Sequence, residues 1–167
     1  MIGTLRGRIW KFGDDINTDL MIPAVALGKS EEDMLKHCFS VIRPGWADLV
    51  HRGDMIVAGR NFGTGSSRPG ARVLKALGID CLLAESINGL FLRNCVNFGL
   101  PALPCTGVFE AFEEGDNAEV DLRRGKITNQ TSGVVLGTSP FPEMLLKIIN
   151  AGGIIAMLEA EGYLEEA

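Results

Sequence analysis

Residues 5–12 alternate apolar and polar side chains, which is the pattern of a strand with one buried face. Further along the chain, short apolar runs alternate with segments whose apolar side chains recur every three or four residues. The short runs predict buried strands at 54–58, 80–84 and 100–103. The longer segments predict helices at 69–77 and 87–98. A strand–helix–strand–helix–strand order predicts a parallel sheet with right-handed crossovers.

Other segments complete the predicted fold. A helix is expected over residues 30–39, with Ser30 as its N-cap and acidic residues in its first turn. Strands at 118–122 and 126–129 are separated by a short polar turn and predict a β-hairpin. The last helix is expected over residues 140–151. These patterns predict an α/β fold in which a parallel sheet core with helices is followed by a C-terminal β-hairpin region.

The composition favours one compact domain over residues 1–167, because 46% of the residues are hydrophobic and can form a substantial core. The net charge is −5 and the basic residues are scattered, so no nucleic-acid footprint is expected. No apolar run reaches the roughly 18 residues of a membrane span. The N-terminal residues lack the apolar core of a signal peptide. A cytoplasmic protein without nucleic-acid or membrane partners is therefore expected.

Two groups of residues could suggest a metal. The cysteines Cys38, Cys81, Cys95 and Cys105 form no C-x-x-C pair, so buried thiols in a reducing compartment are favoured over zinc or a redox dithiol. The segment 14–19 contains three aspartates and an asparagine, the composition of a calcium loop. It lacks the glycine and the distal glutamate of that motif, which favours a capped turn. No metal ligand is assigned in this chain.

The segment most indicative of chemistry is the glycine-rich stretch 59–71, which leads from a strand into a helix. Glycines, two adjacent serines and arginines meet there at a helix N-terminus, where backbone N–H groups attract anions. The P-loop lysine is missing, and Arg68 stands where the dinucleotide motif needs a glycine. A carboxylate ligand is favoured, because the Arg68 guanidinium matches its planar geometry. The alternative is an ordinary helix N-cap decorated with serine and arginine.

The stretch Gly-Arg-Asn-Phe-Gly-Thr-Gly-Ser-Ser-Arg (59–68) resembles the signature of the small subunits of isopropylmalate isomerase and of related homoaconitases. Further blocks that resemble the family follow the same order along the whole chain, at 7–19, 22–23, 84–86, 93–94, 99–101, 114–116 and 151–153. The resemblance implies a swivelling β/β/α domain, like the fourth domain of aconitase.

The resemblance also implies a reaction, the dehydration and rehydration of a 2-hydroxy dicarboxylic acid. In this family a separate large subunit carries a four-iron, four-sulfur cluster, and no cysteine triad for one is present here. The implied base is Ser66, and Arg68 is the implied clamp for a substrate carboxylate. The residues expected to shape the loop around them are Asn61, Gly63, Thr64, Gly65 and Ser67. The position of segment 14–19 in the family suggests that Asp15 or Asp19 orients these groups.

The chain departs from the usual family loop, which reads Gly-Cys-Gly-Ser-Ser-Arg-Glu-His-Ala. Thr64 replaces the cysteine, and Pro69-Gly70 replaces the glutamate and histidine. Arg72 stands where proline is common, about one turn beyond Arg68. It is expected either to add a second cation to the site or to be an ordinary solvated helix residue.

The segment expected to contact the variable group of the substrate departs as well. After Ile22-Pro23 the family often has Tyr-Leu-Arg or Tyr-Leu-Val, whereas this chain has the small and apolar residues Ala26, Leu27 and Gly28, followed by Lys29. This puts isopropylmalate and homocitrate in question as substrates. Lys29 and Arg72 are candidates for binding an extra substrate carboxylate.

Three alternatives stay open from the sequence. The chain could serve a homoaconitase, or a dehydratase of citramalate or dimethylmalate type. It could also be a non-catalytic anion-binding module that has kept the fold, for which the missing Glu-His pair is the main argument. The expected partner is the large subunit, and a homo-oligomer of the isolated chain is a further alternative.

Overall fold

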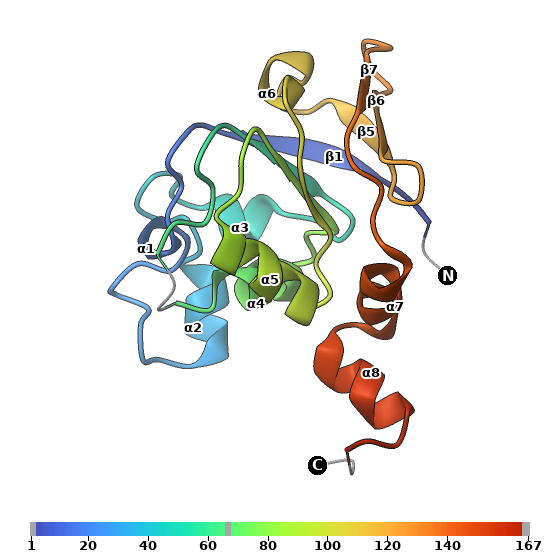
Figure 1. Ribbon diagram of the computed structural model, residues 1–167. Helices are drawn as coiled ribbons and strands as arrows, with labels where there is room; N and C mark the ends of the chain where they lie inside the picture. Colours follow the sequence, from blue (N-terminus) through green and yellow to red (C-terminus); the bar gives the residue numbers. More distant parts are fainter. Residues whose placement is uncertain (1–2, 66–67, 165–167) are drawn as a thin grey trace.

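The computed structural model describes residues 3–65 and 68–164 and contains a mixed sheet (Figure 1). In the described residues, seven strands are joined in the spatial order β4-β3-β2-β1-β5-β6-β7. Their bounds are β1 Thr4–Phe12, β2 Met55–Ala58, β3 Cys81–Ala84, β4 Ala102–Pro104, β5 Asn117–Asp121, β6 Lys126–Asn129 and β7 Val135–Gly137. The first four strands are parallel to one another and the last three are antiparallel.

The strand β1 joins the two parts of the sheet. Its second half pairs in parallel with β2, with Ile9 opposite Met55, and its first half pairs antiparallel with β5, with Leu5 opposite Val120. The predicted parallel arrangement is confirmed, because β2, β3 and β4 follow one another in parallel register. The predicted hairpin is β5–β6, and it extends the same sheet.

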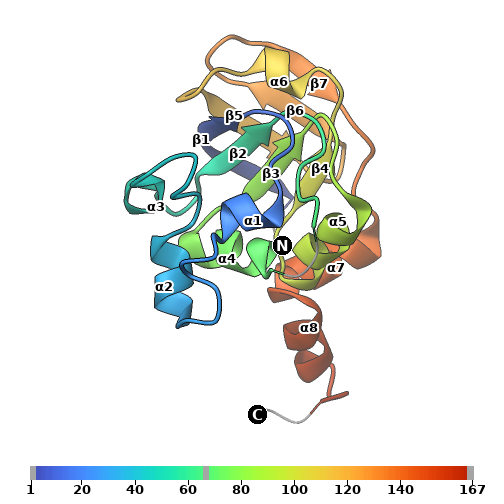
Figure 2. The ribbon, with the colours of Figure 1, turned by 90° about the vertical axis from the view of Figure 1, so that its left-hand side faces the viewer.

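Helices α1 to α6 lie in the connections between strands, and α7 and α8 follow β7. Their bounds are α1 Thr18–Met21, α2 Glu31–Lys36, α3 Trp46–Leu49, α4 Gly70–Leu77, α5 Gly89–Asn97, α6 Val108–Ala111, α7 Glu143–Ala151 and α8 Ile154–Ala160. In Figure 1, α1 to α5 lie below β1, whereas α6 and strands β5 to β7 lie above it. Figure 2 shows α8 projecting from the lower end of the helical layer.

Successive residues of β2 point into two different cores. Ile56 and Ala58 belong to the core between the sheet and helices α1 to α5, whereas Met55 and Val57 belong to a second core with β5, β6 and α6. All four side chains are buried, because the antiparallel part of the sheet folds over the parallel part. This layering of strands, strands and helices confirms the predicted β/β/α class.

The helix expected over residues 30–39 is shorter than predicted. Ser30 is its N-cap, with Oγ accepting from the Asp33 N–H at 3.2 Å, but the regular helix ends at Lys36. Phe39 adopts a φ of 57°, and its ring centroid lies 4.4 Å from that of Phe12 and 5.0 Å from that of Trp46. The chain leaves the helix because burial of Phe39 in this aromatic cluster offsets the cost of a left-handed backbone.

The C-terminal region contains two elements that the sequence patterns did not indicate, β7 and α8. The helix predicted over 140–151 is α7, which begins at Glu143 and ends at Ala151, and its C-cap Gly152 has a φ of 91°. Gly153 follows, and a Cβ there would lie only 2.5 Å from the Asn97 carbonyl oxygen. This close approach turns the chain into α8, where Met157 packs against Val96 and Ile148.

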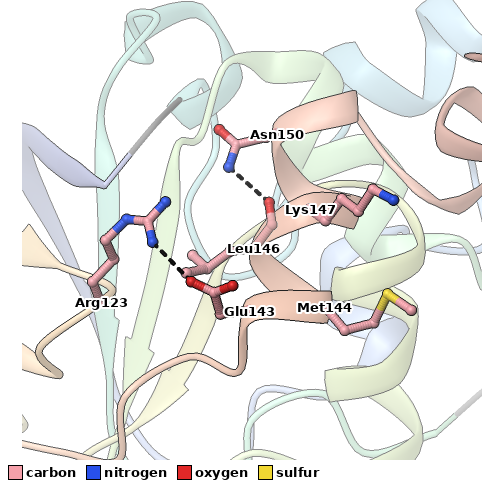
Figure 3. A pocket seen from close by; sticks show the side chains of 6 residues that line it. All are labelled: Arg123, Glu143, Met144, Leu146, Lys147 and Asn150. Carbon is pink, nitrogen blue, oxygen red and sulfur yellow. Dashed lines mark hydrogen bonds and ion pairs between the residues drawn. The ribbon is translucent and has the colours of Figure 1, made fainter.

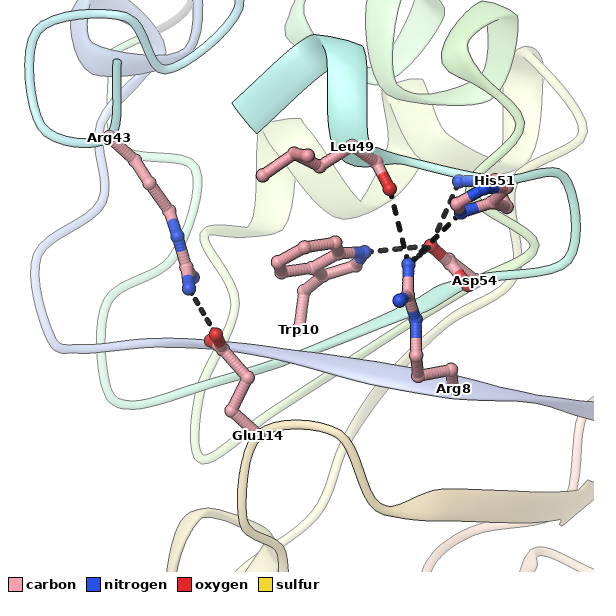
Figure 4. Close-up of polar contacts among 7 residues, drawn as sticks. All are labelled: Arg8, Trp10, Arg43, Leu49, His51, Asp54 and Glu114. Carbon is pink, nitrogen blue, oxygen red and sulfur yellow. Dashed lines mark hydrogen bonds and ion pairs between the residues drawn. The ribbon is translucent and has the colours of Figure 1, made fainter. Parts of the chain in front are cut away.

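A buried carboxylate fixes the start of β2 (Figure 4). Asp54 Oδ2 accepts hydrogen bonds from Arg8 Nη2 at 2.8 Å, Trp10 Nε1 at 2.7 Å and the His51 N–H at 2.9 Å. Burial alone would raise the pKa of Asp54, but these donors stabilise the charged form and hold its pKa below the usual range. The cluster anchors the connection between α3 and β2 to β1.

Candidate active site

The glycine-rich loop lies at the carboxyl ends of the parallel strands. It follows β2, and two other loops reach it from the ends of β1 and β3. Asp14 Oδ1 accepts from the Arg60 N–H at 2.7 Å, and the Ser86 Oγ accepts from the Asn61 N–H at 2.8 Å. This edge of a parallel sheet is the usual place for a ligand site, because the loops that converge there are free to vary.

The acidic segment 14–19 supports this loop. Asn61 Nδ2 donates to Asp15 Oδ1 at 2.9 Å, and both residues have φ values near the left-handed region, 59° and 57°. Asn17 caps α1, with Oδ1 accepting from the Leu20 N–H at 2.9 Å. Over residues 3–65 and 68–164, no three His, Cys, Asp or Glu side chains are grouped to hold a metal ion. The cap that Asn17 forms agrees with the capped-turn interpretation of this segment.

Gly63 fits the loop against α5. Its φ is 81°, and a Cβ at this position would lie 2.2 Å from the Phe91 Cγ. Its N–H donates to the Ile16 carbonyl at 2.7 Å, which ties the loop to the segment after β1. The backbone conformation and the lack of space both require glycine here.

Replacing Gly63 with alanine is expected to lower the free energy of unfolding by about 3 kcal/mol, because backbone strain adds to the clash with Phe91. Urea unfolding of the isolated chain measures this change. Gly133→Ala is the matched control, since Gly133 has a similar φ of 82° but no atom within 4 Å of its Cβ position. An equal loss of stability in both variants would contradict a packing role for Gly63.

Thr64 and Gly65 are held against α1. The Thr18 N–H donates to the Thr64 carbonyl at 2.9 Å, and Asn17 and Thr64 form an isolated parallel bridge. Gly65 has a φ of 79°, and Thr18 Oγ1 is the atom nearest to its Cβ position, at 2.9 Å. Thr18 is only 1% exposed, and no hydrogen-bond partner of its hydroxyl is found in the described parts of the chain. A buried hydroxyl left in this state costs about 1–3 kcal/mol.

Arg68 is held in place from two sides. Its Nε lies 3.0 Å from Asp19 Oδ1, and its Nη1 donates to the Ile22 carbonyl. The Arg68 side chain is 15% exposed, whereas that of Asp19 is 64% exposed. Among the described residues, Nη2 has no hydrogen-bond partner.

The other predicted residues are distributed around this arrangement. Ser66 and Ser67 lie outside the described residues. Arg72 is half-buried in the first turn of α4, and its Nε is a buried donor without a partner in the described residues. In the turn after Ile22-Pro23, Leu27, Gly28 and Lys29 are exposed, but Ala26 is fully buried and cannot contact a substrate.

The replacement of the family histidine by Gly70 has a packing explanation. Gly70 is buried at the start of α4, and a Cβ there would lie 2.6 Å from the Met21 Sδ and 3.2 Å from the Phe91 Cε2. Met21 and Phe91 therefore occupy the space that a larger side chain would need. The loss of the histidine is coupled to this packing and does not by itself indicate a loss of activity.

The sequence patterns predicted no role for two residues of the site, Thr18 and Ser86. Ser86 lies in one of the blocks that resemble the family, which is the signal that could have drawn attention to it. Thr18 lies in such a block as well, 7–19, but burial of its hydroxyl beside Gly65 depends on how α1 packs against the loop.

A hollow of about 620 Å³ lies elsewhere, over α7 (Figure 3). It is lined by Arg123, Glu143, Met144, Leu146, Lys147 and Asn150. Arg123 Nη1 pairs with Glu143 Oε1 at 3.3 Å, and Asn150 Nδ2 donates to the Leu146 carbonyl at 2.7 Å. None of its lining residues belongs to the glycine-rich loop or to the segments that hold it.

Comparison with known proteins identifies the family. The chain is 43% identical over 164 residues to the 3-isopropylmalate dehydratase small subunit 1 of Methanopyrus kandleri. The aligned residues cover 97% of this chain and 96% of the relative. The chain belongs to the family of 3-isopropylmalate dehydratase small subunits. The family described as Aconitase C-terminal domain matches residues 46–106, which include the whole glycine-rich loop.

Two further comparisons concern Methanocaldococcus jannaschii. Its isopropylmalate/citramalate isomerase small subunit is 41% identical over 161 residues, 95% of this chain and 96% of the relative. A crystal structure described as its 3-isopropylmalate dehydratase superposes with a TM-score of 0.86 at 32% identity, covering 96% of both chains. These findings confirm the predicted fold and the hydro-lyase small-subunit class of the 3-isopropylmalate dehydratase family.

The cysteines of this family member are free and buried, as predicted. Burial raises the pKa of the Cys38, Cys81, Cys95 and Cys105 thiols above the ordinary value. Cys38 and Cys95 lie in one core and Cys81 and Cys105 in the other, and no three of the described His, Cys, Asp and Glu side chains are grouped to hold a metal ion, so these four positions do not fit an iron–sulfur cluster. Separately, none of the described helices is long and apolar enough to span a membrane.

Proposed function

We propose that this chain supplies half of the active site of a two-subunit hydro-lyase that dehydrates and rehydrates a 2-hydroxy dicarboxylic acid. The observation that carries the proposal is the fixed position of Arg68. Asp19 and the Ile22 carbonyl hold its guanidinium at the edge of the loop, and Nη2 has no partner among the described residues. This nitrogen can donate to a substrate carboxylate, and displacement of the exposed Asp19 would allow a bidentate pair.

In this proposal Ser66 is the base that removes the proton from the substrate carbon next to a carboxylate. A serine hydroxyl is a weak base, so its anionic form needs donors and positive charge nearby. Arg68 and the N-terminus of α4 provide positive charge on the carboxyl side of Ser66. The proposed role of the remaining loop residues is to shape the loop around Ser66 and Arg68; these residues are Asn61, Gly63, Thr64, Gly65 and Ser67.

The proposed partner is a large subunit with a four-iron, four-sulfur cluster. Such a cluster would act as a Lewis acid toward the substrate hydroxyl and carboxylate. Turnover therefore needs both chains, because this one offers no fitting ligands. The buried thiols suit a reducing compartment, and we propose that the complex works in the cytoplasm.

The turn after Ile22-Pro23 supports a substrate with an apolar variable group. Leu27 is 48% exposed and Val25 is 52% exposed, so apolar side chains face outward close to the carbonyl that holds Arg68. This favours isopropylmalate or citramalate, the compounds in the names of the relatives, over homocitrate. If Lys29 and Arg72 instead bind a third carboxylate of the substrate, a compound such as homocitrate would be preferred. The apolar turn and the two cations therefore predict different substrate preferences.

Reconstitution with the cognate large subunit tests the proposal. The complex is expected to turn over isopropylmalate or citramalate in preference to homocitrate, and this chain alone is expected to be inactive. Lys29→Ala and Arg72→Ala distinguish the role of the cations, because a carboxylate contact would raise the KM for the preferred substrate. An unchanged KM would exclude that role. A complex that forms but turns over no hydroxy diacid would favour the non-catalytic module.

A further inference from the structure

Val41 and Ile42 hold apolar side chains at the surface of an anchored turn. Their exposed fractions are 65% and 42%. The Ile42 and Arg43 N–H groups both donate to the Phe39 carbonyl, at 3.1 and 2.7 Å, which closes the turn 39–43. Phe39 itself is fully buried in the aromatic cluster described above. The first end of the turn is therefore fixed by a core residue.

Arg43 anchors the other end of the turn. Its guanidinium carbon lies 5.0 Å from the centre of the Trp10 ring and 5.4 Å from that of the Phe12 ring. Its Nη1 donates to the Lys11 carbonyl at 3.3 Å, and its Nη2 pairs with Glu114 (Figure 4). Because both ends are held, the two aliphatic side chains between them stay at the surface, outside both cores.

This turn lies next to the glycine-rich loop. Ile42 and Ile16 line the same hollow of about 390 Å³, at the carboxyl end of β1. The Ile16 carbonyl accepts from the Gly63 N–H of the loop at 2.7 Å. Gly13 also lines the hollow, and its carbonyl accepts from the Gly59 N–H, where the loop begins, at 3.2 Å. The exposed aliphatic side chains therefore border the edge of the sheet that carries the candidate active site.

The protein that would cover this surface follows from the incomplete site. Among the residues that the structure describes, no three His, Cys, Asp or Glu side chains are grouped to hold a metal ion. The chain belongs to a family of small subunits, so the subunit that completes the site has to approach the glycine-rich loop. A protein that covers the loop also meets the hollow bonded to it. Apolar side chains that are already fixed suit such a contact, because little conformational freedom is lost on binding.

We propose that Val41 and Ile42 form a docking site for the large subunit, an inference that rests on the proposed function. The matching surface of the large subunit would present apolar side chains to these two residues. It would present polar side chains to the hollow, because Lys11, Arg43 and Glu114 line it as well. Docking would then depend on residues outside the loop that carries the chemistry.

The test measures the Kd between the purified large subunit and variants of this chain, by titration calorimetry under anaerobic conditions. Val41→Asp is expected to raise Kd about 10²-fold, because it buries a charge in an apolar contact, and Val41→Ser about tenfold. At saturating concentrations of this chain, kcat and KM should keep their wild-type values. Val135→Asp is the matched control, because Val135 is 53% exposed on the last strand of the sheet, β7, and should leave Kd unchanged.

A wild-type Kd for Val41→Asp would overturn the proposal, and so would an equal rise in Kd for Val135→Asp. Thermal unfolding of the isolated chain tests for a structural role, since an exposed side chain predicts the wild-type Tm for Val41→Asp. If Val41→Asp lowers Tm and raises Kd while Val41→Ser changes neither, the residue serves the fold and the proposal is overturned.

Two further outcomes separate the alternatives. Sedimentation velocity tests a second copy of this chain as the occupant: a dimer that Val41→Asp dissociates, with an unchanged Kd for the large subunit, would overturn the docking site. If the wild-type chain forms no complex with the large subunit, the proposed function fails, and this inference fails with it. If an active complex forms with the same Kd for wild type and Val41→Asp, only the docking site is wrong.

Discussion

Ser66→Ala is expected to lower kcat of the reconstituted enzyme by about 10³- to 10⁴-fold, the upper range for the loss of a positioned base. The substrate would still bind, because Arg68 and the large subunit are intact, so KM should change little. The loss would lie in the chemical step, where the proton next to the carboxylate must leave. Steady-state kinetics with the preferred hydroxy diacid, together with exchange of that proton with deuterated solvent, measure it.

The control for this variant is Ser139→Ala. Ser139 is exposed in the segment between β7 and α7, away from the loops that hold Arg68. It should leave kcat and KM unchanged. Proton exchange at the wild-type rate in Ser66→Ala would show that another group is the base, and would remove the central role proposed for this chain.

Arg68→Ala is expected to lower kcat/KM by about 10³-fold, mainly through a higher KM, because a charge-assisted bond to the substrate carboxylate is lost in a largely desolvated place. Arg68→Lys should recover only a small part, since an ammonium group lacks the planar pair of donors. The Asp19 contact adds a second expectation. Without Arg68, Asp19 has no cation in the described residues and would repel an incoming carboxylate.

Arg124→Ala is the matched control, because Arg124 lies in the exposed turn after β5 and pairs only loosely with Asp121, at 3.8 Å. It should leave kcat/KM unchanged. If Arg68→Lys has the full activity of the wild type, a point charge is sufficient and the planar clamp is wrong. Competition with a dicarboxylate inhibitor would report the same change in affinity without turnover.

The order of the main elements followed from local patterns. The alternation over 5–12, the helical spacing at 69–77 and the short apolar runs gave the parallel unit, because each pattern reflects which faces of an element are buried. The same patterns missed the short helices α1, α3 and α6 as well as α8 and β7, and they extended α2 beyond Lys36. In these places the deciding contacts come from distant residues, such as Phe12 and Trp46 for Phe39, and Asn97 for Gly153.

The candidate site, too, could be predicted only in part from the sequence. Its loop and Arg68 were predicted from the sequence, since glycines, serines and arginine at a helix start have few other uses together. The hydrogen bonds from Asn61 to Asp15 and Ser86 could not be predicted, because they join three loops from separate strands. Burial of Ala26, predicted to face the substrate, also depends on packing that no local pattern reports.

The sequence by itself determined the family, the α/β class and the residues that can carry chemistry, because these depend on residue types and on their short-range spacing. Only the tertiary structure decided how those residues are held. It placed α1 against the glycine-rich loop, paired Arg68 with Asp19, and buried the Thr18 hydroxyl beside Gly65. These features arise from contacts between segments far apart in the chain, whose geometry is fixed only when both cores close.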